Sequence, residues 1–389
     1  MTPFALLFAI KQTSTFVGQT QFPPLTAEAA IIVHADSGRI LWGRNIDMPM
    51  YPASTTKLLT SLILLEETSP TDQIQAPKDI KKIRGSSLHM QPFETISAEA
   101  AAYALLLRSA NDTAYSVALK LGGSENGFAK KMNALSQKLG MKNSHWVTPH
   151  GLNNPWHKTT ARDLSLLGRY ALNNDRLVEI TSTAEYTIQR SINQKDILLK
   201  NSNKLLKEDK EKSLKGFKTG YTNPAGLCFV GYKESPIGKL VTVILNSKDW
   251  AADQVAITKW AETSFHQTDN LLADYQATFT PINGKDDQVL TAIASRPVPA
   301  LVSQEDIQNL KVIPRRTEFP APIPATSLLT PATVQLPDGT TFQTELVAAN
   351  TVEAKPNLAE FIRNPIGISL ILFASAAYWY RRRTYDKLN

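Results

Sequence analysis

The chain has 389 residues, of which 42% are hydrophobic and 20% are charged. This composition is typical of a globular protein and excludes a largely disordered one. The formal net charge is +7, but no basic stripe is interleaved with aromatic residues, so a nucleic-acid partner is not expected. The single cysteine, Cys228, excludes an intrachain disulfide. The histidines show no metal-binding spacing, so no metal is expected.

The N-terminal segment, residues 1–24, has the outline of a secretory signal. An apolar run over residues 4–10 is followed by polar residues and then by Pro23 and Pro24. Secretory signals begin with a basic region, and no Lys or Arg precedes the run here. We therefore expect a signal or a signal remnant, with a frayed terminus or a mis-assigned start codon as the alternative.

Residues 25–268 are predicted to form one α+β domain. Strand patterns occupy 29–35 and 39–42, and helix-forming runs begin at Ser54 and after Ser97. Strand patterns return only late in this segment. Because early and late strands flank a helical middle, we expect one sheet that joins distant parts of the chain. The remaining predicted elements are helices at 113–121, 128–139 and 250–265 and strands at 216–220, 226–232 and 239–245.

Two regions of different composition follow this domain. Residues 269–350 alternate apolar and polar side chains around prolines, with a hairpin signal at Asp338 and Gly339. They predict a small all-β domain. Residues 351–364 are polar and predict a linker.

The C-terminal segment, residues 365–389, predicts a transmembrane anchor. Residues 366–380 carry no charge, end in aromatic side chains and precede Arg381 and two further arginines. This pattern is typical of a membrane span with a cytoplasmic basic tail, which would place the rest of the chain outside the cell membrane. The run is shorter than the ~20 residues of an ordinary span. The alternative is a helix that lies in the membrane interface, but the weak separation of apolar and polar faces in this segment counts against it.

The most informative feature of the chain is a Ser-x-x-Lys tetrad at 54–57. A helix that opens at Ser54 places Lys57 one turn away on the same face, ahead of an apolar run over 58–65. A serine hydroxyl becomes a good nucleophile when a base removes its proton, and a neutral lysine can be that base. A free lysine has a pKa near ~10.4, which burial or a second cation lowers.

Two further motifs follow in order, a Ser-Ala-Asn triad at 109–111 and a Lys-Thr-Gly triad at 218–220. Lys218 can supply the second cation if its strand lies against the tetrad. The N–H of Ser54 and a donor just beyond Gly220 can then stabilise an oxyanion. Taken singly, the motifs are also explained as a helix cap, a turn and a strand end. Their order and placement favour the catalytic interpretation.

The residues around these motifs carry a family resemblance. The chain resembles the serine-type D-alanyl-D-alanine carboxypeptidases of peptidase family S11, which are low-molecular-mass penicillin-binding proteins. The resemblance implies a β-lactamase/transpeptidase-like α+β fold, with an antiparallel sheet and a helical subdomain, then a small β domain and a C-terminal membrane helix. It covers roughly residues 25–265 and lies mainly in the segments 51–60, 108–112, 122–124, 149–152 and 216–226.

The resemblance also implies roles for the motif residues. Ser54 attacks the carbonyl between the last two D-alanines of a peptidoglycan stem peptide, and Lys57 takes its proton. β-Lactams acylate Ser54 in the same way, and no cofactor takes part. The other implied roles are proton relay by Ser109 and Lys218, binding of the substrate amide by Asn111, contact of Thr219 and Lys218 with the terminal carboxylate, close approach of substrate at Gly220, and oxyanion-hole N–H groups on Ser54 and Tyr221.

Two stretches depart from the family pattern. Many relatives carry an arginine shortly after the last core strand, where it helps to bind the substrate carboxylate. Lys248 is the candidate replacement in this chain. Residues 89–93 differ from the usual apolar continuation of the loop that begins at Arg84, so we expect an altered rim of the site.

Three alternatives use the same fold. A D,D-endopeptidase would cut cross-links with the same machinery. A β-lactamase would need a dedicated deacylation glutamate, which the sequence does not identify. A catalytically silent scaffold would keep the fold without the reaction. The trailing β domain and C-terminal segment favour the carboxypeptidase, and the intact set of motif residues argues against a silent scaffold.

Overall fold

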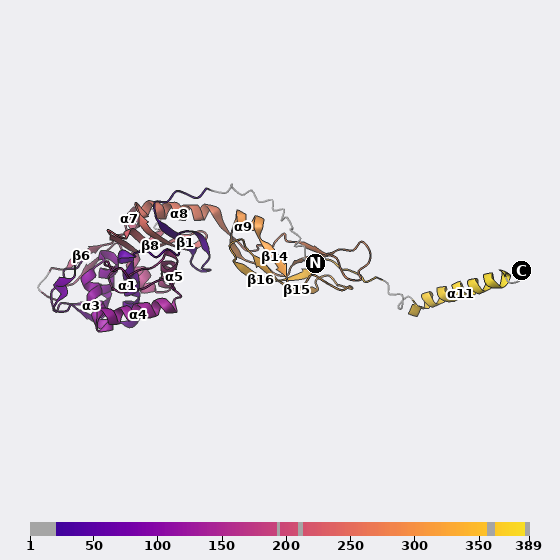
Figure 1. Cartoon of the computed structure of the whole chain (residues 1–389), viewed down its shortest axis with the longest axis horizontal. Helices are drawn as coiled ribbons and strands as arrows, with labels where there is room; N and C mark the ends of the chain where they lie inside the picture. Colours follow the sequence, from indigo (N-terminus) through magenta and orange to yellow (C-terminus); the bar gives the residue numbers. More distant parts are fainter. Residues whose placement is uncertain (1–20, 193–194, 209–212, 356–361, 386–389) are drawn as a thin grey trace. The chain divides into compact units, whose positions relative to one another are not determined.

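The computed structural model describes the chain apart from residues 1–20, 193–194, 209–212, 356–361 and 386–389 (Figure 1). The chain divides into two compact units, an N-terminal unit of Gly18–His266 and a C-terminal unit that begins at Gln267. Most of the predicted signal segment lies outside the described residues, as does much of the predicted linker. The domain limits derived from the sequence stay predictions.

A five-stranded antiparallel sheet forms the centre of the N-terminal unit, with the strand order β2-β1-β9-β8-β7. Strand β1, from the start of the unit, pairs with β9 near its end, so that Ile32 lies opposite Thr242. The sheet therefore joins distant parts of the chain, as the sequence predicts. Its strands are β1 (Ala29–His34), β2 (Ile40–Arg44), β7 (Leu214–Thr222), β8 (Gly226–Ser235) and β9 (Gly238–Ser247).

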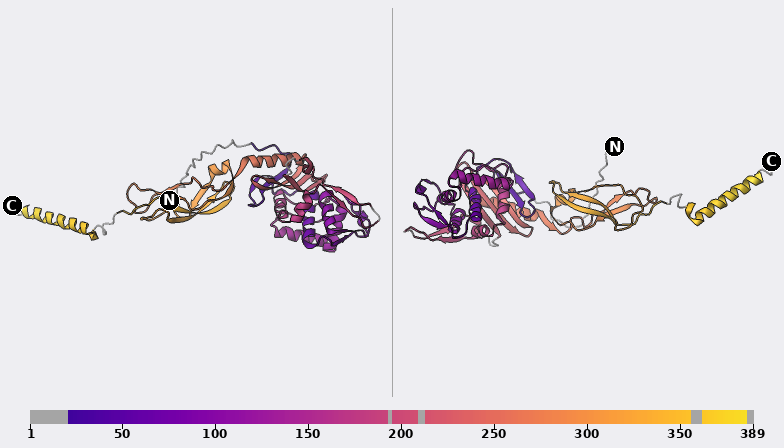
Figure 2. Two further views of the ribbon diagram at one scale, coloured as in Figure 1. Left: turned by 180° about the vertical axis from the view of Figure 1, so that it is seen from behind. Right: turned by 90° about the horizontal axis from the view of Figure 1, so that it is seen from below.

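Helices cover both faces of this sheet (Figures 1 and 2). Phe229 of β8 stacks on Trp250 of α8 (Trp250–Ser264), with ring centroids 4.3 Å apart. The next residue, Val230, faces α5 (Ala161–Ala171), where a Cβ at Gly168 would lie 3.5 Å from it. Successive side chains of a strand point to opposite faces. Coverage on both sides explains why the inner strands are almost continuously apolar.

Most of the other helices of this unit pack around α1 (Thr56–Glu67), whose residues 56–65 are all buried. The motif positions differ from the prediction in two details. Ser54 lies in a short 3₁₀ turn ahead of α1, and the helix after Ser97 passes into a π-helical turn before Ser109. The elements are η1 (Ala53–Thr55), η2 (Ile80–Lys82), α2 (Ala98–Tyr103), η3 (Ala104–Arg108), α3 (Asn111–Gly122), α4 (Glu125–Lys138), α6 (Asp175–Ser182), α7 (Leu205–Glu208) and the two-stranded sheets β3 (Gln73–Gln75) with β4 (Thr95–Ser97) and β5 (Glu185–Ile188) with β6 (Ile197–Lys200). Strand β10 (Phe265–Thr268) spans the limit between the two units.

The C-terminal unit has its own apolar core and a five-stranded sheet of order β11-β12-β16-β15-β14. The predicted hairpin is present, and Gly339 in its turn has a left-handed φ of 86°. The prediction of an all-β domain is wrong in one element, the helix α9 (Gln304–Asn309), which Ser303 and Asp306 begin with a capping box. The strands are β11 (Ala277–Phe279), β12 (Leu290–Ala294), β13 (Ala300–Ser303), β14 (Lys311–Pro314), β15 (Leu328–Gln335) and β16 (Thr341–Ala348).

The C-terminal segment forms a helix, α11 (Pro365–Tyr385). Among the described residues, no helix combines the length and the apolar character needed to cross a membrane. The predicted transmembrane span is therefore not supported, because the uncharged part of α11 ends at Arg381, short of the ~20 residues of an ordinary span. The cytoplasmic position of the basic tail depended on that span and stays a prediction.

Candidate active site

The turn that carries Ser54 is fixed by an unusual backbone. Ala53, just before it, has a left-handed φ of 47°, which costs energy for a residue with a Cβ. The carbonyl oxygen of Ala53 accepts a hydrogen bond of 2.8 Å from Thr56 Oγ1. A Cβ at Gly151 would lie 1.8 Å from this same oxygen, so only glycine allows the loop to pass. These contacts set where Ser54 lies at the start of α1.

His157 supports the same turn from outside. Its Nδ1 accepts a hydrogen bond of 3.0 Å from the N–H of Val147, so Nε2 carries the proton of the neutral ring. Nε2 lies 2.9 Å from Thr56 Oγ1 and donates to it. Burial lowers the pKa of His157 to about 3, so the ring stays neutral near pH 7. We conclude that His157 is a fixed hydrogen-bond donor that holds the turn.

Lys57 is fully buried, and its amino group faces Ser54. Nζ donates to Ser54 Oγ over 3.0 Å and to the carbonyl oxygen of His150 over 2.8 Å. Burial lowers the pKa of Lys57 well below its usual value, the charge of Lys218 lowers it further, and the carboxylate of Asp112 opposes both. A neutral amine at this distance can take the hydroxyl proton of Ser54.

Lys218 reaches the same site from β7. A β-bulge between Gly216 and Lys218 changes the register against β8, and such bulges re-aim a side chain. The residue is only 2% exposed, and burial lowers its pKa to about 7. Nζ donates to the carbonyl oxygen of Thr219 over 2.8 Å. Within the described residues, no carboxylate forms an ion pair with Lys57 or Lys218.

Strand β7 passes close to the N-terminal end of α1. A Cβ at Gly220 would lie 2.9 Å from the backbone nitrogen of Ser54, so the approach requires a glycine. The next residue, Tyr221, is 61% exposed, and its hydroxyl donates to Asn223 Oδ1 over 3.2 Å. The third motif therefore lies directly beside the backbone N–H of Ser54.

Ser202 lies beside the third motif, and the sequence analysis did not identify it. Its Oγ lies 2.8 Å from Thr219 Oγ1, and its N–H donates to the carbonyl oxygen of Leu107. It therefore joins β7 to the helix that ends at Ser109. The segment 201–203 has no catalytic residue pattern of its own, and only its position beside Thr219 identifies it.

The second motif provides two polar atoms that have no partner in the described structure. Ser109 has a left-handed φ of 64°, and its buried Oγ makes no hydrogen bond. Asn111 begins α3 and is fixed by a 2.7 Å hydrogen bond from Nδ2 to the carbonyl oxygen of Arg84. That bond identifies Oδ1 as its remaining acceptor, which is buried and unpaired. Because an unpaired buried polar atom costs free energy, both atoms suit hydrogen bonds to a bound substrate.

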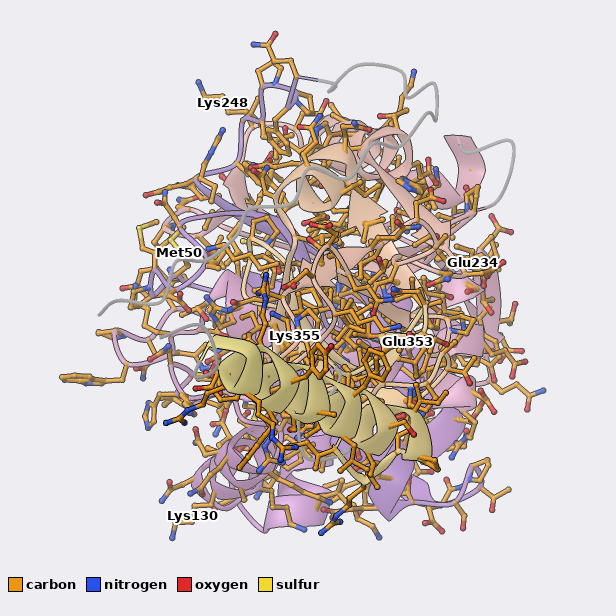
Figure 3. All side chains as sticks on the ribbon, turned by 90° about the vertical axis from the view of Figure 1, so that its right-hand side faces the viewer. Met50, Lys130, Glu234, Lys248, Glu353 and Lys355 are labelled. Atoms are coloured by element: carbon orange, nitrogen blue, oxygen red, sulfur yellow. The ribbon has the colours of Figure 1, made fainter. Side chains whose placement is uncertain are left out.

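Lys248, the candidate replacement for a family arginine, lies just beyond β9. Its side chain is exposed and projects from the surface in Figure 3, and its backbone N–H donates to Thr26 Oγ1 over 3.1 Å. A role in carboxylate binding stays a prediction. In the part of the chain that the structure describes, no group of three or more His, Cys, Asp or Glu side chains could hold a metal ion.

Comparison with known proteins identifies the family of the chain. Residues 17–249 match peptidase family S11, the D-alanyl-D-alanine carboxypeptidases. The chain is 24% identical over 351 residues to D-alanyl-D-alanine carboxypeptidase DacF of Bacillus subtilis, which covers 88% of this chain and 89% of the relative. It is 30% identical over 244 residues to a D-alanyl-D-alanine endopeptidase of Pseudomonas aeruginosa, with 61% of this chain and 78% of the relative covered.

Among solved structures, the carboxypeptidase DacD of Francisella tularensis shares the fold, with a TM-score of 0.68 at 21% identity over 88% of this chain and 97% of that one. The fold is thus the α+β penicillin-binding fold. The chain belongs to the D-alanyl-D-alanine carboxypeptidase family S11. It is a serine-type carboxypeptidase, a hydrolase of cell-wall metabolism.

Proposed function

We propose that Ser54 is the nucleophile of this carboxypeptidase and that Lys57 is its base. The observation that carries the proposal is the fully buried Lys57, whose Nζ lies 3.0 Å from Ser54 Oγ and whose pKa is well below its usual value. As Ser54 Oγ bonds to the carbonyl carbon of the penultimate D-alanine, Lys57 takes the hydroxyl proton. The N–H groups of Ser54 and Tyr221 stabilise the oxyanion that forms.

The intermediate then loses the terminal D-alanine. The carbon–nitrogen bond breaks, and the leaving nitrogen receives a proton that we route from the lysines through the unpaired Oγ of Ser109. A water molecule then adds to the acyl carbon, and Lys57 takes its proton. The bond from the acyl carbon to Ser54 Oγ breaks, Oγ receives the proton from Lys57, and the shortened peptide leaves as its carboxylic acid. A β-lactam acylates Ser54 by the same first step.

Substrate binding follows from the remaining polar groups. We assign Asn111 Oδ1 to the N–H of the substrate amide, because this buried acceptor is unpaired and its side chain is fixed by Arg84. Thr219 and the charge of Lys218 receive the terminal carboxylate, and the substrate passes Gly220. A bound carboxylate would raise the pKa of Lys218 above about 7 and favour its charged form.

The site of action follows from the substrate. Peptidoglycan stem peptides lie outside the cytoplasmic membrane, and we place the N-terminal unit there. Apolar side chains on α11, including Leu372 and Phe373, are exposed. Exposed apolar patches mark sites of protein or membrane contact, which supports contact of this helix with a membrane. Flotation of the full chain with anionic vesicles tests this contact. A Phe373→Glu variant that floats as well as the wild type would contradict it.

Intact-mass measurement of the full chain with a penicillin and with a D-Ala-D-Ala pentapeptide tests the catalytic proposal. We expect one penicillin adduct on Ser54 and release of one D-alanine, and neither with Ser54→Ala. Cleavage of cross-linked dimers without D-alanine release would favour an endopeptidase, the activity named for the Pseudomonas aeruginosa relative. The absence of any adduct would favour a silent scaffold.

A further inference from the structure

We propose that Arg190 and Glu94 are positioning residues that fix the amide of Asn111 for substrate binding. The inference rests on the proposed function, because it assigns a substrate contact to Asn111. Neither residue belongs to a motif, and they are 96 positions apart in the sequence. The loop 84–94 links the pair to Asn111, and it contains the stretch 89–93 that departs from the family pattern.

The two side chains form a buried bidentate ion pair. Both are 0% exposed. Arg190 Nε donates to Glu94 Oε1, and Nη2 donates to Glu94 Oε2 over 2.6 Å. The N–H of Gln91 adds a second hydrogen bond of 2.8 Å to Oε2. Removal of either charge would leave the other buried without compensation, so the pair acts as one unit.

Leu88 connects this pair to the second motif. Its carbonyl oxygen accepts a hydrogen bond of 3.2 Å from Arg190 Nη1. Its N–H donates over 3.1 Å to the carboxylate of Asp112, next to Asn111 in the chain. The same carboxylate accepts from Ser87 Oγ and from the N–H of Met90. The loop is therefore held from both sides, by Arg190 on one and by Asp112 on the other.

The start of the loop holds the Asn111 side chain. The carbonyl oxygen of Arg84 accepts from Asn111 Nδ2 over 2.7 Å, and that of Ser86 accepts from the backbone N–H of Asn111 over 2.7 Å. A Cβ at Gly85 would lie 2.7 Å from Nδ2, so the loop lies in close contact with the amide. These carbonyl groups decide where Oδ1 points. A shift of the loop would therefore move the group that we assign to the substrate.

Kinetics in a double-mutant cycle separate positioning from general stability. Arg190→Lys keeps the charge but has one ammonium group in place of the fork that contacts both Glu94 and Leu88. Its kcat/KM for D-alanine release is compared in the wild-type background and in the Asn111→Ala background. Glu94→Gln is the second variant, measured in the same cycle if Arg190→Lys does not fold.

Arg162→Lys is the matched control. Arg162 forms a bidentate pair with Asp47 of the same geometry, but both side chains are largely exposed and neither touches the loop. The melting temperature of every variant is recorded beside its kinetics. We expect the control to leave kcat/KM unchanged in both backgrounds.

Positioning predicts that Arg190→Lys lowers kcat/KM about tenfold or more, since a misplacement of ~1 Å at a reacting group can cost on the order of a hundredfold. In the Asn111→Ala background the same change should cost less than about twofold. Equal losses in both backgrounds, or no loss in either, would overturn the proposal. If the wild type releases no D-alanine, the proposed function is refuted but the positioning proposal is not. The same cycle is then measured with the rate of penicillin acylation in place of kcat/KM.

Discussion

The N-terminal unit buries two sets of ionisable side chains in opposite ways. At Arg190 and Glu94, all three guanidinium nitrogens and both carboxylate oxygens have partners. Lys57 and Lys218 are as deeply buried, yet their amino groups contact only a hydroxyl and carbonyl oxygens, and burial lowers the pKa of both. Charge is compensated in the first set and left uncompensated in the second.

This difference separates a structural role from a catalytic one. An ion pair whose side chains are both 0% exposed cannot contact a substrate, so its geometry can only hold other groups in place. A buried lysine without a carboxylate gives up its proton readily, which a base requires. Ser109 Oγ and Asn111 Oδ1 resemble the two lysines in lacking full compensation, because they are buried without a hydrogen-bond partner in the described structure. The two sets should therefore respond differently to substitution.

Lys57→Met should show the largest effect. We expect penicillin acylation to slow by on the order of 10²–10⁴-fold, because the base is lost. Stability should change by less than about 1.5 kcal/mol, since the variant loses hydrogen bonds but also removes a buried amine. Acylation followed by mass spectrometry and unfolding in urea measure the two effects. A variant that acylates at the wild-type rate would refute the assignment of the base.

Arg190→Met should lower the free energy of unfolding strongly, in contrast to Lys57→Met. It leaves the carboxylate of Glu94 buried and unpaired, which typically costs about 3–5 kcal/mol. The double variant Glu94→Leu with Arg190→Met removes both charges and should recover most of this loss. Urea unfolding of both variants provides the comparison. If the single and double variants were equally unstable, the uncompensated charge would not be the cause.

A contact between two residues can be predicted from the sequence when the two are close together along the chain. Ser54 and Lys57 are one helical turn apart, so their contact was predictable, and the motif order predicted that Lys218 would join them. The left-handed backbone at Ser109 and the hydrogen bond from His157 to Thr56 were not predictable, because both depend on the conformation of loops. The pair of Arg190 and Glu94 joins two loops that no local pattern relates.

The same reasoning applies outside the site. The turn at Gly339 was predictable because it is local, whereas α9 was missed although Ser303 and Asp306 carry a capping signal. A helix at the C-terminus was predicted, but a run of apolar residues alone does not establish a membrane span. Local sequence patterns thus predicted the position of a turn or helix better than they predicted what surrounds it.

The pH dependence of stability should follow the uncompensated lysines. Lys218 has a pKa of about 7 in the folded state against an ordinary 10.5, so the folded protein binds fewer protons than the unfolded chain between these values. The free energy of unfolding should therefore rise with pH from about 7 to 10.5, and the cost of burial is fully present below pH 7. Lys218→Met should flatten this rise. Parallel curves for the two proteins would contradict the lowered pKa.

The exposed pair of Arg162 and Asp47 should show the smallest effect. Its geometry is bidentate like that of the buried pair, but water screens both groups. We expect Arg162→Met to cost less than about 1 kcal/mol in urea unfolding. A loss as large as that of Arg190→Met would show that burial is not what distinguishes the two pairs.

An NMR titration of the Lys57 amino group tests the central claim most directly. The full chain is labelled with ¹³C at the lysine side chains, and the Lys57→Met spectrum identifies the signal. The account predicts that Lys57 loses its proton well below the usual lysine range, and that Lys218→Met moves its pKa upward because a neighbouring cation is removed. A Lys57 that stays protonated up to about pH 10, as a free lysine does, would contradict its assignment as the base.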